Sequence, residues 1–182
     1  MDDDAIEAAE ALAGSEGISQ LVAGLDSSVA ENNEESAEAI LDAILRMSSD
    51  IKSPEVLQSL AGHQTTTFAK VLATFLEEVT VIEVLFAVLN KIHMSEDPAS
   101  SFGSVRENVA NVLKAMDTHS EGEETLIEYG CQVINTMALG NEAAAKMLIE
   151  EGVEERLSAA KEIITNERNQ KYVVQARATL KI

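Results

Sequence analysis

One stretch of the sequence has the spacing of a calcium-binding loop. Asp117, His119, Glu121, Gly122 and Glu128 fall at positions 1, 3, 5, 6 and 12 of the EF-hand pattern. Histidine at the third position is a poor ligand for a hard cation, and glutamate at the fifth is longer than the usual side chain. The same residues also read as a turn between two helices, which is the interpretation we favour. Calcium binding stays an alternative hypothesis, and we expect no metal site.

The other residues that could do chemistry are isolated. His63, His93 and His119 are scattered, without the spacing of zinc ligands. Cys131 has no recognisable histidine partner and lies at an apolar step of a predicted helix, so we expect a packed thiol. A redox response through Cys131 is kept beside calcium binding as the alternative function. The chain has no phosphate-binding loop and no nucleophile elbow, so we expect neither an enzyme nor a cofactor.

Acidic residues dominate the charge of the chain, but unevenly. The formal net charge is −19, made up of −12 over residues 1–50, −8 over residues 51–150 and +1 over residues 151–182. Such a field opposes binding to nucleic acid and to anionic membranes, which require clustered lysine and arginine. The sequence therefore favours a basic protein or peptide as partner. The other interpretation is that the acids only keep a helical surface soluble.

Several features bear on where the protein works. A single cysteine excludes an internal disulfide and fits a reducing compartment. The acidic start at Met1 is unlike a signal peptide, and the richest apolar stretch is far shorter than a membrane span. We expect a protein of the cytosol or the nucleus.

Helical periodicity runs through most of the chain. Residues 36–47 place Ala37, Ile40, Leu41, Ile44 and Leu45 at spacings of three and four, which predicts one apolar stripe on a helix. Residues 80–92 are apolar almost all round and too long for a strand, so we predict a central buried helix there.

Helix ends are marked by capping residues. Ser120 with Glu123 has the spacing of a capping box. Asn141 is placed to cap a helix over residues 143–150, and Gly152 to close it in a left-handed conformation. Gly130, inside a predicted helix, indicates close approach of a neighbouring helix.

The helical pattern repeats along the chain. Val22, Leu72, Leu113 and Leu157 hold equivalent places, at intervals of 50, 41 and 44 residues. A period of this length with two or three helices per unit is in the range of HEAT and armadillo repeats. We predict one all-α domain of about four repeats, the last of them truncated. The approximate repeats are 1–50, 51–96, 97–140 and 141–182.

Two segments resemble the armadillo family. Residues 16–22 are similar to the start of its second repeat helix, and residues 112–137 to its Met-x-x-His turn and Gly-Cys third helix. The cycle restarts at Glu151-Gly152-Val153. The resemblance implies a right-handed superhelical α-solenoid whose third helices form a groove for an extended peptide. It is good over residues 103–165, fair over 16–50 and weak over 51–102.

The resemblance also suggests which residues contact the partner. In importin-alpha-like members an aromatic residue and an asparagine four positions later line the groove. Phe86 and Asn90 match this pair, whereas Asn135 has Cys131 in the aromatic place. Acidic side chains on related faces would add charge. The residues expected to bind the partner are Asp42, Arg46, Glu83, Phe86, Asn90, Glu128, Cys131 and Asn135, with Arg177 and Lys181 at the corresponding places of the fourth repeat.

The last residues leave an apolar face on the fourth repeat. Repeat arrays need polar outer faces on their terminal units. Either the chain is a fragment of a longer array, or this end associates with another copy.

Overall fold

The computed structural model describes residues 3–11, 15–50, 54–94 and 101–182, and within these ranges it contains helices and no β-strand. The all-α fold class is therefore confirmed. None of the described helices is long and apolar enough to cross a membrane. The α-helices are α1 Asp3–Ala11, α2 Ser15–Glu31, α3 Glu34–Asp50, α4 Pro54–Ala61, α5 Ala69–Thr74, α6 Val79–His93, α7 Arg106–Thr118, α8 Glu124–Ala138, α9 Glu142–Glu150, α10 Val153–Ile163 and α11 Lys171–Leu180, with a π-helical turn η1 at Gln64–Phe68 and a 3-10 turn η2 at Phe102–Ser104.

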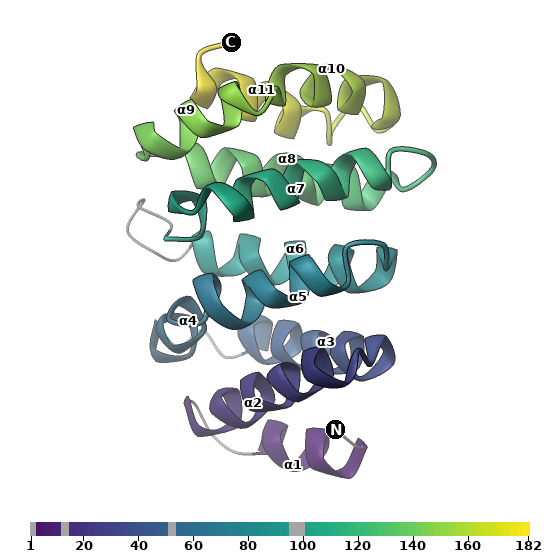
Figure 1. Cartoon of the computed structure of the whole chain (residues 1–182), viewed down its shortest axis with the longest axis vertical. Coiled ribbons are helices and arrows are strands. Elements are labelled where there is room, and N and C mark those ends of the chain that lie inside the picture. Colours follow the sequence, from purple (N-terminus) through teal and green to yellow (C-terminus); the bar gives the residue numbers. More distant parts are fainter. Residues whose placement is uncertain (1–2, 12–14, 51–53, 95–100) are drawn as a thin grey trace.

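The helices are arranged in four layers that follow one another along the chain (Figure 1). The first layer is α1 to α3, the second α4 to α6 with η1, the third η2 to α8, and the fourth α9 to α11. The closing helix of each layer packs on that of the next, so that α3 contacts α6, α6 contacts α8, and α8 contacts α11. The middle helices α2, α5, α7 and α10 form a second series of contacts in the same order.

Helix α6 lies in the middle of the first series. Its Phe86 and Leu89 side chains have no exposed surface, and residues on both sides of the helix are buried because α3 and α8 cover it. The expected central helix over residues 80–92 is confirmed. The stripe expected over residues 36–47 is confirmed as well, since Ala37, Ile40, Leu41 and Ile44 are fully buried and Leu45 is half-buried.

Polar bonds between layers join residues about one period apart. The Thr179 hydroxyl donates to Asn135 Oδ1 over 2.7 Å, across 44 positions of the sequence. His119 Nε2 lies 2.9 Å from the carbonyl oxygen of Leu76, 43 positions away. Because each bond couples neighbouring layers at a similar offset, the layers are held in a common register. Further pairs with separations of 39 to 45 are Asp26–Thr67, Glu38–Thr80, His93–Thr136, Arg106–Glu151, Asp117–Arg156, Glu124–Thr165 and Glu128–Asn169.

Two of the predicted helix ends are confirmed, and one is wrong. Asn141 Oδ1 accepts from the backbone N–H of Ala144 at 3.0 Å, and Gly152 is left-handed with φ of 77°, as expected. The capping box at Ser120 is wrong. Its hydroxyl donates to the carbonyl oxygen of Asp117 instead, and the residue before α8 is Glu123, without a side-chain cap. Ser120 stays with the turn that ends α7, four positions short of α8.

Gly130 marks the close approach that the sequence indicates. A Cβ atom at this position would lie 2.9 Å from Cγ and Sδ of Met116, on helix α7. The missing side chain lets α8 pack directly against the Met116 side chain.

The burial of α6 makes the first prediction. Leu89→Ala should lower the free energy of unfolding by about 2–5 kcal/mol, because it removes a side chain with no exposed surface from the contact between layers. Urea unfolding followed by circular dichroism measures the change. Met94→Ala is the matched control, since Met94 is 78% exposed at the end of the same helix. Equal losses in both variants would contradict the central place given to α6.

Candidate functional site

The outward face of α3, α6 and α8 has a row of carboxylates. Glu38, Glu83 and Glu128 are each the fifth residue of their helix, and they recur at intervals of 45 positions. All three are half-buried. Since these helices pack side by side, the three side chains form a line across the layers, which we call the acidic row.

Two of these carboxylates accept hydrogen bonds from other side chains, and the third accepts none from the described residues. The Thr80 hydroxyl donates to Glu38 at 2.8 Å, and Asn169 Nδ2 donates to Glu128 at 2.6 Å. Within the described part of the chain, Glu83 has neither a hydrogen bond nor an ion pair. Burial raises the pKa of Glu83, and the charge of Glu123 raises it further. A cation placed beside Glu83 would stabilise its ionised carboxylate and so oppose both causes of the raised pKa.

The pKa of Glu128 is also raised, and burial is the main cause. The Asn169 hydrogen bond opposes this effect, and the charge of Glu124 adds to it. Glu124 itself is engaged by the loop before α11, because it accepts from the backbone and hydroxyl of Thr165 at 3.0 and 2.8 Å. These bonds lower the pKa of Glu124, the Thr165 hydroxyl bond first. Glu83 is therefore the one carboxylate of the row without a hydrogen-bond donor among the described residues.

Two tyrosines lie beside the acidic row and were not predicted. Burial raises the pKa of Tyr129, and the charges of Glu83 and Glu128 add smaller contributions, so both carboxylates lie near its hydroxyl. Tyr172 is half-buried on α11, and Lys171 Nζ lies 4.7 Å from the centre of its ring. An indication was present in the sequence, because tyrosines are scarce in this chain and these two are one period apart.

The predicted asparagines lie at contacts between helices. Asn90 and Asn135 are each the twelfth residue of their helix. Asn90 is 5% exposed, and its Nδ2 donates to the carbonyl oxygen of Tyr129 at 3.2 Å, while its buried Oδ1 has no partner among the described residues. Asn135 is half-buried and accepts from Thr179, which leaves its NH2 group unbonded within the described structure. Only Asn135 therefore has donors to offer at the surface.

Two of the expected partner contacts are core residues instead. Phe86 and Cys131 have no exposed surface, because each lies on the side of its helix that packs into the layers, so their assignment to a binding surface is wrong for this conformation. Burial raises the pKa of the Cys131 thiol to about 12, with a smaller contribution from Glu128. A thiol so placed is neutral and inaccessible, which removes support from the redox alternative.

The remaining predicted residues lie near the two ends of the stack. Asp42 and Arg46 line a hollow of about 420 Å³ together with Asp3 and Glu7 of α1. On α11, the Arg177 guanidinium lies 3.4 Å from Glu154, and Lys181, which follows the helix, is exposed. The structure thus places Glu83 and Glu128 on neighbouring helices, and Asp42 and Arg46 beside α1.

The first and last residues of the calcium-like pattern, Asp117 and Glu128, form hydrogen bonds with other side chains. Asp117 accepts from Nε and Nη2 of Arg156, at 3.0 and 2.7 Å, whereas Glu128 is bound to Asn169. In the described part of the chain, no three histidine, cysteine or carboxylate side chains are grouped to hold a metal ion.

A buried polar network joins the second and third layers at His93. Its Nδ1 lies 2.9 Å from the Thr136 hydroxyl, and its Nε2 lies 2.8 Å from Gln64 Oε1, in the π-helical turn η1. With the ring proton on Nε2, the imidazole donates to Gln64 and accepts from Thr136. Burial lowers the pKa of His93 to about 4, so the ring is neutral at pH 7.

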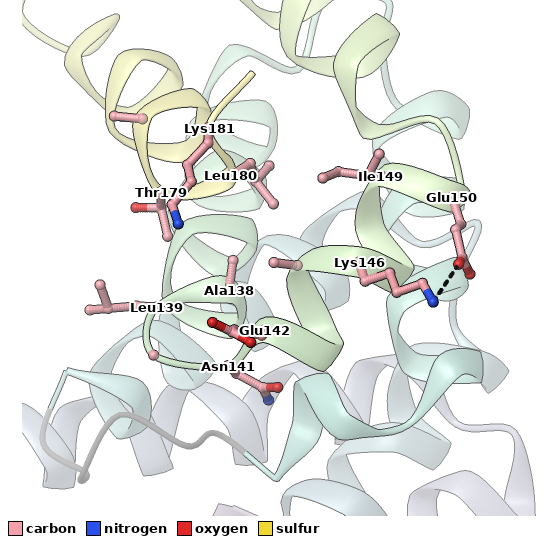
Figure 2. A pocket seen from close by; sticks show the side chains of 13 residues that line it. Ala138, Leu139, Asn141, Glu142, Lys146, Ile149, Glu150, Thr179, Leu180 and Lys181 are labelled. Carbon is pink, nitrogen blue, oxygen red and sulfur yellow. Dashed lines mark ion pairs between the residues drawn. The ribbon is translucent and has the colours of Figure 1, made fainter.

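A groove lies in the fourth layer, and we call it the α9–α11 groove. It has a volume of about 870 Å³ and lies between the end of α11, helix α9 and the loop before α9. Figure 2 shows Leu180, at the end of α11, and Lys181, which follows it, across from Lys146 and Ile149 of α9. The sequence indicated an apolar face here but not the groove itself, because its walls come from segments about 30 residues apart.

The chain matches no protein-family model, no curated protein and no solved structure. The resemblance to armadillo proteins therefore stays a prediction.

The His93 network predicts a loss of stability in acid. The folded-state pKa of His93, about 4, lies below its usual value of 6.5, so the unfolded chain binds a proton first as the pH falls. Stability should decrease from about pH 6.5 down to about pH 4, by about 3 kcal/mol for this group. Urea unfolding across that range, compared with His93→Gln, measures the contribution as a difference in slope.

His63→Gln is the control for that comparison, because His63 is half-buried between α4 and η1 and lies outside the network. It should keep the slope of the unchanged protein. An unchanged slope in His93→Gln would show that the imidazole is not held neutral by the fold.

Proposed function

We propose that the chain is an armadillo-like α-solenoid that binds a basic protein or extended peptide across the outward face of α3, α6, α8 and α11. The acidic row is the observation on which this proposal rests. Three carboxylates at one register form an extended anionic line, and an extended chain with lysine or arginine side chains is its natural complement.

The layered packing supports the solenoid part of the proposal. Successive closing helices contact one another, as do successive middle helices, and bonds between layers recur at offsets near the period of the sequence pattern. Arrays of this kind present a long continuous surface to a partner.

The electrostatic state of Glu83 supports a cationic partner. A half-buried carboxylate without a paired cation is less stable when ionised than one in water. A guanidinium or ammonium group brought to this position gains an ion pair in a partly desolvated place, beside the ring of Tyr129. Aromatic rings also attract cations, which adds to the preference.

The acidic row predicts the effect of neutralising two of its three members, Glu83 and Glu128. Glu83→Gln with Glu128→Gln should weaken binding of an oligoarginine peptide by about tenfold, since close charge pairs at an interface contribute strongly to affinity. Isothermal titration calorimetry at near-physiological salt measures the change.

The control for this pair removes the same two charges elsewhere. Glu77 and Glu107 are exposed residues outside the row, and Glu77→Gln with Glu107→Gln should change the affinity by about twofold or less. If both double variants weaken binding equally, the peptide responds only to net charge and the assigned face is wrong.

The two asparagines predict different outcomes. Asn135→Ala should weaken binding of the peptide by about 0.5–1.5 kcal/mol, the net value of one hydrogen bond, and it also removes the bond from Thr179 that joins α8 to α11. Asn90→Ala should leave binding unchanged and alter the unfolding free energy, because its side chain is 5% exposed and bridges α6 to α8. Parallel calorimetry and urea unfolding separate the two effects. The opposite assignment of effects would exclude Asn135 from the binding face.

A further inference from the structure

A lysine stands where the acidic row would continue into the fourth layer. Lys171 is the first residue of α11, and it follows Glu128 by 43 positions. The neighbouring Tyr172 follows Tyr129 by the same interval. Helix α11 packs on α8, the last helix of the row, as α8 packs on α6. The repeated packing therefore brings a cation to the place of a fourth carboxylate.

Two observations place Lys171 near Glu128. Asn169, two residues before Lys171, donates from Nδ2 to Glu128 Oε2 at 2.6 Å. Burial raises the pKa of Glu128, whereas the Asn169 bond and, less strongly, the charge of Lys171 oppose that rise. The ammonium group of Lys171 therefore lies within electrostatic reach of the last carboxylate of the row.

An aromatic ring holds Lys171 at this position. Its Nζ lies 4.7 Å from the centre of the Tyr172 ring, and the attraction between ammonium and ring favours this place over free solvent. The Lys171 side chain is exposed, and it forms no ion pair with any described residue. A partner that lies along the row thus meets three carboxylates and then one ammonium group.

We propose that Lys171 ends the acidic row and selects a partner whose basic run is followed by an acidic residue. This inference rests on the proposed function and adds the order of charges in the partner: basic side chains across the first three layers, and an aspartate or glutamate at the fourth. An arginine opposite Lys171 meets a like charge, whereas a carboxylate there pairs with its ammonium group. Repulsion of the wrong side chain contributes to specificity together with attraction of the right one.

The first test changes the charge of Lys171 and measures the affinity for oligoarginine by isothermal titration calorimetry. Lys171→Glu should strengthen binding about tenfold, because it removes a repulsion and adds a fourth carboxylate to the row, and Lys171→Gln should give a gain of about threefold. Lys114→Glu is the matched control. It makes the same change of net charge at an exposed lysine of α7, and it should alter the affinity by about twofold or less at salt near 0.15 M, which screens distant charges.

The second test changes the peptide, with two glutamates added to one end of oligoarginine or to the other. The peptide whose glutamates reach α11 should bind about tenfold more tightly than its counterpart. At the opposite end of the row, glutamates meet the hollow lined by Asp3, Glu7 and Asp42, where Arg46 is the one base among the described lining residues. Lys171→Glu should abolish the difference between the two peptides.

Equal effects of Lys171→Glu and Lys114→Glu would overturn the proposal, as would equal affinities of the two glutamate-ended peptides for the unchanged protein. Circular dichroism of each variant checks that it is folded. Failure of the proposed function gives a different result, because oligoarginine would then not bind, or would bind regardless of Glu83→Gln with Glu128→Gln. Binding that depends on the row but not on Lys171 overturns this inference alone.

Discussion

The whole arrangement depends on helices that have apolar side chains on more than one side. Helix α6 buries Phe86 and Leu89 together with Val81 and Ile92, which no single neighbour could cover. Such a helix is stable only between two others, and α3 and α8 provide these surfaces. The other layers have the same requirement, because each layer completes the burial of the layer before it. The stability of the layered packing therefore depends on the interfaces between neighbouring layers.

Polar side chains at the contacts between layers then determine how the layers align. Apolar contacts are nondirectional, whereas bonds such as Thr179 to Asn135 and the His93 contacts require one register. Burying polar side chains between layers also has an unfavourable energy. Asn90 shows this, because its Oδ1 is buried without a hydrogen-bond partner among the described residues. An unsatisfied oxygen of this kind weakens the core locally, and the bond from its Nδ2 to Tyr129 offsets part of that cost.

The proposed binding face occupies one part of an uneven charge distribution. The acidic row lies across the middle of the stack, where burial raises the pKa of Glu83 and of Glu128. The α9–α11 groove lies at the less acidic end, opposite the acids of α1.

The sequence alone determined the helical class and where the principal helices lie, because periodicity near 3.6 depends only on local order. It also identified the Asn141 cap, the left-handed Gly152 and the close approach at Gly130, each of which follows from the residue's own conformational or steric properties. It did not decide which side of a helix faces a partner. Phe86 and Asn90 share a helix with Glu83, yet two of the three side chains are buried, since that depends on how α3 and α8 cover α6. The acidic row, Tyr129 beside it and the groove at α11 exist only where separate segments meet, and that meeting is a property of the packed layers rather than of any one stretch of sequence.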